Sequence, residues 1–160
     1  MSIEIRTATP TDAAKIADFQ IAMAAETESK TLDQQTVETA VAKVFQDPTK
    51  GFYIVASADS VVVGSLMITF EWSDWRDTNI WYIQSVFVEA AFRGQKLFSR
   101  MFDRVKKMAA EQNVKHIRLY VEQDNDHAQN VYQSLGMKRL PYFMYDIEVP
   151  STTGSRKCLA

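Results

Sequence analysis

A glycine-bearing junction between two hydrophobic patterns is the stretch of this sequence best suited to chemistry. Residues 81–99 change once from an apolar β-type run to a helical period, with Arg93 and Gly94 at the change. The first N–H groups of a helix lack intrahelical partners, and their partial positive charge favours phosphate. We therefore expect this junction to bind a phosphorylated ligand, although an ordinary strand-to-helix turn would show the same pattern.

Carboxylates and indoles form a second candidate group, which suits a cation. A polar connection predicted at residues 71–79 holds two tryptophans and three carboxylates, and Glu26 and Glu28 lie in a segment that breaks an earlier helical pattern. Carboxylates attract an ammonium ion, and an indole adds roughly 0.5–2 kcal/mol of cation–π stabilisation. Each group also has an alternative interpretation. The glutamates can belong to a solvated loop. The tryptophans can cover the edge of the hydrophobic core. On the first interpretation, the residues expected to bind such a cationic substrate are Glu26, Glu28, Trp72, Trp75, Trp81 and Gln84.

Composition excludes several classes of protein. The chain has 160 residues and a formal net charge of −2, with no basic stripe, so nucleic acid is not an expected partner. The single Cys158 excludes an intrachain disulfide framework, and two well-separated histidines do not suggest a metal pair, so we expect no metal site. No apolar run is long enough to span a membrane and the N-terminus lacks a signal-peptide pattern, which favours a cytoplasmic protein.

The elements that must position these residues alternate between strand and helix patterns. Thr9, Pro10 and Asp12 are typical of a helix start, and Thr31 or Asp33 would begin a second helix that ends at Asp47. The order is therefore a strand at 3–6, two helices, a hairpin of strands at 52–56 and 61–70, a central strand from 81, a helix from 97, a strand at 116–121, a short helix after 125 and strands at 137–139 and 142–149. This order predicts an α/β layered fold in one domain over residues 1–149, with a flexible tail at 150–160.

Two motifs resemble the GNAT superfamily of acyl-CoA-dependent N-acetyltransferases. The family's pyrophosphate signature, Gln/Arg-x-x-Gly-x-Gly/Ala, falls on residues 93–98, with Lys96 and Phe98 in place of its small residues. Its second motif matches Asn125, Ala128 and Tyr132. The resemblance implies a mixed, mostly antiparallel sheet of about seven strands flanked by about four helices.

The resemblance also implies a site for acetyl-CoA. The backbone of Val86, Phe87 and Val88 would pair with the pantetheine arm, in an opening between the central strand and the one holding Leu119. The expected pyrophosphate and further cofactor contacts are Arg93, Gly94, Gln95, Lys96, Leu97, Phe98, Ser99, Asn125 and Tyr132.

Acyl transfer to an amine needs a proton donor for the leaving thiolate and a base for the amine. Tyr132 is the expected donor, because its ordinary pKa of about 10 keeps it protonated at neutral pH. Some relatives carry a glutamate where this chain has Gln84, whose amide cannot accept a proton. Glu71 is therefore the expected base, with Glu26 or Glu28 acting through water as alternatives.

The sequence thus predicts an acetyl-CoA-dependent N-acetyltransferase acting on a primary amine of a small molecule, amino acid or peptide. A non-catalytic acyl-CoA sensor or interaction module on the same fold is the alternative. A nucleotide-binding regulator is favoured less, since the sequence holds neither a full P-loop nor a dinucleotide fingerprint. Fold analogy also allows a homodimer.

Overall fold

The computed structural model describes residues 2–150 of the chain. They divide into two compact units, with the boundary between Asp124 and Asn125. The first unit holds a β-sheet and three α-helices, and the second holds one α-helix, α4 (Asp126–Ser134). The units are described separately below.

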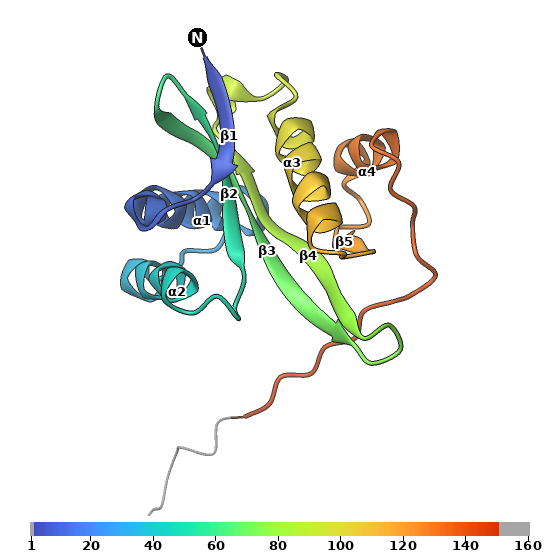
Figure 1. Cartoon of the computed structure of the whole chain (residues 1–160). Helices are drawn as coiled ribbons and strands as arrows, with labels where there is room; N and C mark the ends of the chain where they lie inside the picture. Colours follow the sequence, from blue (N-terminus) through green and yellow to red (C-terminus); the bar gives the residue numbers. More distant parts are fainter. Residues whose placement is uncertain (1, 151–160) are drawn as a thin grey trace, which may run out of the picture. The chain divides into compact units, whose positions relative to one another are not determined.

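The first unit is built on a five-stranded sheet in which the strands follow one another in sequence order (Figure 1). Neighbouring strands are antiparallel except for the last pair, β4 and β5, which are parallel. The strands are β1 (Ile3–Thr7), β2 (Phe52–Ala58), β3 (Val61–Ser73), β4 (Thr78–Val88) and β5 (Ile117–Leu119).

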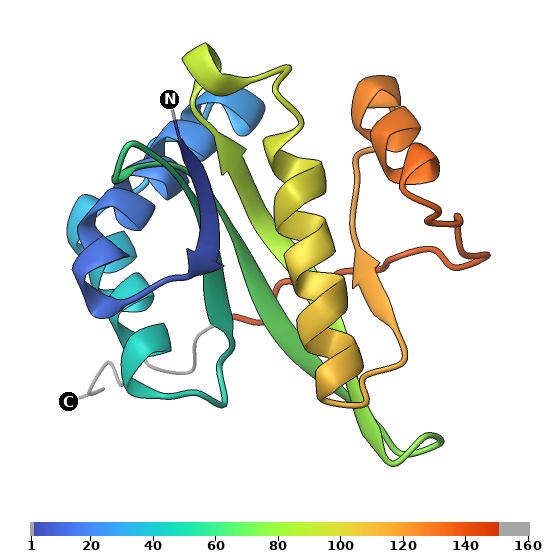
Figure 2. The same ribbon diagram turned by 45° about the horizontal axis from the view of Figure 1, so that its top comes forward.

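Helices cover both faces of this sheet. Figure 2 shows α1 (Ala13–Glu28) and α2 (Gln34–Gln46) on one face and α3 (Leu97–Glu111) on the other. Short 3-10 turns, η1 (Pro10–Asp12) and η2 (Ala90–Phe92), precede α1 and α3. Between residues 2 and 150, no helix combines the length and apolar character needed to cross a bilayer.

The helix starts follow the predicted capping residues. The Asp12 carboxylate accepts a hydrogen bond from the Thr9 backbone N–H at 2.7 Å, which is the return half of a capping box. The Asp33 carboxylate accepts from the backbone N–H of Thr36 at 2.8 Å and caps α2. Asp33, rather than Thr31, is therefore the N-cap of the second helix.

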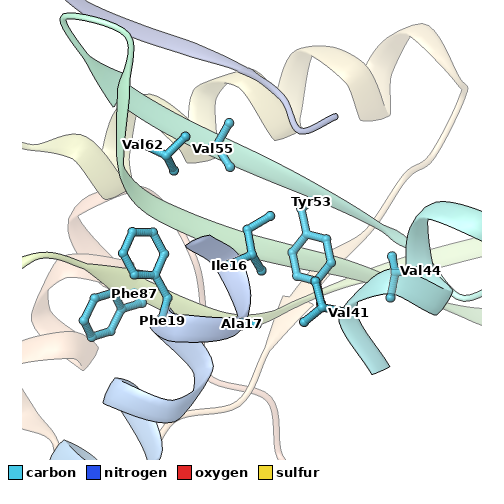
Figure 3. Packing of buried hydrophobic residues seen from close by; sticks show 9 residues of the cluster. All are labelled: Ile16, Ala17, Phe19, Val41, Val44, Tyr53, Val55, Val62 and Phe87. Carbon is cyan, nitrogen blue, oxygen red and sulfur yellow. The ribbon is translucent and has the colours of Figure 1, made fainter. Parts of the chain in front are cut away.

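A buried cluster fixes α1 and α2 against the sheet (Figure 3). Ile16 and Phe19 of α1 are 0% and 3% exposed, as the apolar period of this helix predicts. The Phe19 ring stacks on Phe87 of β4 with 4.9 Å between ring centroids. This contact ties α1 to the end of the central strand, where the candidate site lies.

The sheet has five strands, so the prediction of about seven was wrong. Residues 137–139 and 142–149 form no strand, although polarity alternates over residues 145–149. A strand exists only when its N–H and C=O groups pair with a neighbour, and alternation supplies no partner. The predicted tail lies outside the described residues from position 151 onward.

The polar connection predicted at 71–79 is also mostly strand. β3 continues to Ser73 and β4 begins at Thr78, with Trp72 opposite Asn79 in the ladder. Only residues 74–77 form the turn. The cross-strand ladder overrides the polar composition on which the loop prediction depended.

Candidate active site

A β-bulge interrupts β4, the strand that the sequence predicted from residue 81. Met67 pairs with Gln84 and Ser65 pairs with Phe87, so two residues of β4 oppose one residue of β3. Ser85, in the bulge, has a φ of 51°. One extra residue reverses the side-chain alternation beyond it, which directs Phe87 toward Phe19 on the α1 face.

β4 and β5 separate immediately before this bulge. Their parallel ladder begins at Trp81 opposite Ile117 and ends at Ile83 opposite Leu119, whereas β4 continues to Val88. Within residues 2–124, no strand pairs with the β5 side of β4 beyond Ile83. Unpaired strand edges bind extended ligands through main-chain hydrogen bonds, so this opening can accept an extended arm.

Two residues with positive φ shape the turn between β4 and α3. Gly94 has a φ of 78° and Lys96, the N-cap of α3, has a φ of 59°. A Cβ placed on Gly94 would meet no atom within 4 Å, so the turn needs glycine for its backbone angle and not for space. Lys96 makes no side-chain capping hydrogen bond, and the first turn of α3 begins at Leu97. This arrangement suits an anion.

Phe98 packs along α3. Its ring stacks on Phe102, one helical turn later, with 6.0 Å between centroids. The bulky residue in the signature is therefore accommodated by a contact within the helix. The side-chain amide of Gln95 donates to the Ala91 carbonyl at 3.4 Å, back toward η2.

Arg93 links the turn to two other elements. Its Nε donates to the Val88 carbonyl at 2.9 Å, and its Nη2 donates to the Glu26 carboxylate at 2.7 Å. The guanidinium also lies over the Phe87 ring, 5.7 Å from its centroid. Glu26, near the end of α1, is thus held beside the turn at residues 93–96, whereas Glu28 is paired with Lys30.

Polar side chains gather on the α1 face of the sheet where β4 and β5 separate. The Gln84 amide donates to the Thr69 hydroxyl at 2.6 Å, and Arg118 Nη1 lies 3.6 Å from the Glu71 carboxylate. Arg118 Nη1 also donates to the Tyr82 hydroxyl at 3.4 Å. We call Thr69, Glu71, Tyr82, Gln84 and Arg118 the polar cluster.

Tyr120 stacks on Tyr82 beside this cluster, with 5.2 Å between ring centroids. Burial, and secondarily its hydrogen bond with Tyr82, raises the pKa of Tyr120. Of the polar cluster, the sequence analysis named Glu71 and Gln84 as candidates and did not name Tyr82 or Arg118. Strand alternation could have placed Tyr82 with Gln84, but only the parallel register of β5 brings in Arg118.

The structure does not bring the three tryptophans together. Trp72 and Trp75, at the end of the β3–β4 hairpin, are 61% and 90% exposed. Trp81 is 2% exposed, and its ring packs edge-on against Phe52 at 5.2 Å. An indole box around a cation is therefore not formed by these side chains.

In the second unit, the predicted cofactor residues belong to the start and body of α4. The Asn125 side-chain oxygen accepts from the backbone N–H of Ala128 at 3.0 Å and caps the helix. Burial raises the pKa of Tyr132. A raised pKa keeps this phenol protonated over a wider pH range, as a proton donor requires.

Comparisons with known proteins agree on one family. A model of the acetyltransferase (GNAT) family matches residues 18–137. The thialysine N-epsilon-acetyltransferase of Bos taurus is 32% identical over 79 residues, which make up 49% of this chain and 46% of that protein. The match thus spans about half the length of the curated relatives.

Solved structures extend the similarity over nearly all of the chain. A possible acetyltransferase from Clostridium difficile 630 is 39% identical, with a TM-score of 0.87, covering 94% of this chain and 100% of that one. A predicted acetyltransferase from Clostridium acetobutylicum, crystallised with acetyl-CoA, has a TM-score of 0.75 and 16% identity, covering 91% and 96%. The second comparison shows similarity of fold alone.

Proposed function

Because the chain belongs to the acetyltransferase (GNAT) family, we propose that it transfers an acetyl group from acetyl-CoA to a primary amine of a small molecule, amino acid or peptide. The observation that carries this proposal is the separation of β4 from β5 just before the turn that leads into α3. The opening can hold an extended arm, and the turn that follows it can hold phosphates. The pantetheine arm and the pyrophosphate of acetyl-CoA follow one another in the same order. Membership of the acetyltransferase (GNAT) family supports acetyl-CoA as the cofactor.

In this proposal, the backbone of residues 86–88 pairs with the pantetheine arm and that of residues 93–99 holds the pyrophosphate. The Val88 carbonyl already accepts a hydrogen bond from Arg93. The main-chain groups proposed to contact the pantetheine arm are therefore those of Val86 and the N–H of Val88. Asn125 and Tyr132 complete the cofactor contacts, as the family motif implies.

The reaction is a direct transfer. The lone pair of the neutral amine attacks the thioester carbonyl carbon, and the carbon–sulfur bond breaks as the intermediate collapses. The thiolate takes a proton from the Tyr132 hydroxyl, and the amine nitrogen loses its proton to Glu71, directly or through water. The amide of Gln84, which donates to Thr69, orients the acceptor.

The acceptor site combines Gln84 and Glu71 with Glu26 near the cofactor turn. Glu28 contributes negative charge at the end of α1. Trp72 and Trp75 lie at the hairpin end and contact only a long acceptor, such as a peptide. Trp81 supports the site from within the core, since it is buried.

The second candidate is an acyl-CoA sensor that binds the cofactor without turnover. It is favoured by Gln84, because an amide at this position of the central strand cannot act as a base. Under either function, a homodimer and a cytoplasmic location remain parts of the proposal.

Calorimetric titration with acetyl-CoA, and with coenzyme A lacking the acyl group, tests the cofactor site through Gly94. Gly94→Asp places a carboxylate beside the expected pyrophosphate, and we expect binding to weaken by about tenfold or more. Gly94→Ala is the matched control, because it strains the same positive φ without adding charge, at a cost of about 1 kcal/mol in stability. Equal affinity in the two variants, or no saturable binding by the wild type, would contradict a phosphate site at this turn.

A turnover assay separates the two candidate functions. Binding of acetyl-CoA without release of coenzyme A across a panel of amines would favour the sensor.

A further inference from the structure

Arg118 is a cation at the place where the sheet opens. It lies opposite Tyr82 in the β4–β5 ladder, one pair before the ladder ends. Its side chain is 25% exposed and lies on the same face as Gln84. Residues two apart on a strand are about 7 Å from each other, so Arg118 is roughly one such step from the bulge.

The contacts of Arg118 with its cluster neighbours are long. Nη1 is 3.4 Å from the Tyr82 hydroxyl and 3.6 Å from the Glu71 carboxylate. Charge-assisted hydrogen bonds between a guanidinium and a carboxylate are usually about 2.7–2.9 Å long. Glu71 is itself 52% exposed, and solvent-exposed ion pairs contribute little to stability. An incoming anion can therefore compete with Glu71 for the guanidinium of Arg118.

The surrounding groups fit a molecule that carries both charges. A guanidinium presents a planar fork that matches a carboxylate in a bidentate geometry. Glu71, released from Arg118, offers a negative charge to an ammonium group of the same molecule. The stacked rings of Tyr82 and Tyr120 provide an apolar wall beside them for a hydrocarbon chain.

We propose that the acceptor is an amine that also carries a carboxylate, such as an amino acid, and that Arg118 binds this carboxylate. Arg118 is then the residue that determines specificity, and Glu71 acts on the amine end. This inference rests on the proposed function, because it concerns the acceptor of the same transfer.

Acceptors that differ only in the charge of the carboxyl group test the proposal. β-Alanine, γ-aminobutyrate, ε-aminocaproate and L-lysine are each compared with their primary amides, with release of coenzyme A as the readout. For at least one chain length, we expect the acid to exceed its amide in kcat/KM by about tenfold, with the difference residing in KM. The chain length that gives the largest ratio reports the distance from Arg118 to the reacting carbon.

Variants at position 118 test whether the Arg118 guanidinium causes the preference for the acid over the amide. In Arg118→Gln the ratio of acid to amide is expected to fall to about one, whereas Arg118→Lys keeps part of it because it retains the charge. Arg76→Gln is the matched control, since Arg76 lies in the β3–β4 turn outside the polar cluster, and it should keep the wild-type ratio. If Arg118→Gln does not fold, the wild-type ratio and Arg118→Lys decide the question.

Several outcomes would overturn the proposal. Equal KM values for acid and amide in the wild type would do so, as would an equal loss for both acceptors in Arg118→Gln, which indicates a structural role. Turnover without charge preference contradicts only the Arg118 assignment, whereas absence of turnover with every acceptor contradicts the proposed function. Saturation-transfer NMR with coenzyme A present measures the same preference without turnover, and binding of acids and amides alike there would also reject the role of Arg118.

Discussion

Tyr132 is the single side chain on which the proposed chemistry depends most directly. Burial raises its pKa above the ordinary value of about 10, so the protonated form that can donate to a thiolate is present at neutral and mildly alkaline pH.

Arg93 is a second important side chain, because it holds several parts of the candidate site together. Its guanidinium joins Val88, Glu26 and the Phe87 ring, so one side chain connects the cofactor turn to the end of α1.

Tyr132→Phe removes the proposed proton donor and keeps the ring. We expect kcat to fall by about 10²–10⁴-fold while affinity for acetyl-CoA stays near the wild-type value, because the donor acts only on the leaving thiolate. Stopped-flow or steady-state release of coenzyme A measures the first quantity and calorimetry the second. In the wild type, loss of activity by ionisation of this group should appear only above about pH 10. A variant with unchanged kcat would assign proton donation to another group or to water.

At the scale of elements, the bulge in β4 decides where the strand's side chains point. In a regular strand, Gln84 and Phe87 would face opposite sides of the sheet, because they are three residues apart. The extra residue places Phe87 on the α1 face, where it stacks on Phe19. No motif in the sequence indicates the bulge, because Ser85 is an ordinary strand residue that adopts a positive φ only in the folded sheet.

Substitution of Ser85 tests whether this backbone geometry holds in solution. Ser85→Val should lower the free energy of unfolding by about 1–2 kcal/mol, since a β-branched residue is disfavoured at positive φ. Ser85→Gly is the matched variant and should be at least as stable as the wild type at this backbone angle. Urea unfolding followed by circular dichroism measures both values. Equal stability of the valine and glycine variants would show that position 85 does not keep its positive φ.

At the scale of the whole molecule, the described part of the second unit exposes many large apolar side chains. These are Leu140, Tyr142, Phe143, Met144, Tyr145, Ile147 and Val149, between 47% and 93% exposed. Exposed large apolar side chains concentrated in one segment are typical of protein–protein contacts. It supports the proposed homodimer.

Sedimentation velocity over a range of concentrations tests the association. We expect the wild type to dimerise and the double variant Tyr145→Ser, Ile147→Ser to shift toward monomer, because these side chains are 93% and 82% exposed and the variant removes apolar area from the contact. Trp75→Ser, which removes a 90% exposed side chain in the other unit, is the control and should leave association unchanged. A wild type that stays monomeric at all concentrations would contradict the homodimer.

The local features of this protein can be read from short stretches of its sequence. Capping residues such as Asp33 and the apolar period of α3 are readable because caps and helix faces depend on neighbours within one turn. The glycine turn at residue 94 is local in the same sense, and so is the Asn125 cap of α4.

Features that depend on pairing between distant parts of the chain follow only from the folded structure. The register of β4 against β3 created the bulge, and the short parallel ladder with β5 brought Arg118 beside Tyr82 and Glu71. The same dependence explains the two strands wrongly predicted after residue 136, since alternation cannot show whether a partner strand exists. Hydrogen bonds between strands join residues far apart in the chain, and no short sequence pattern contains both partners.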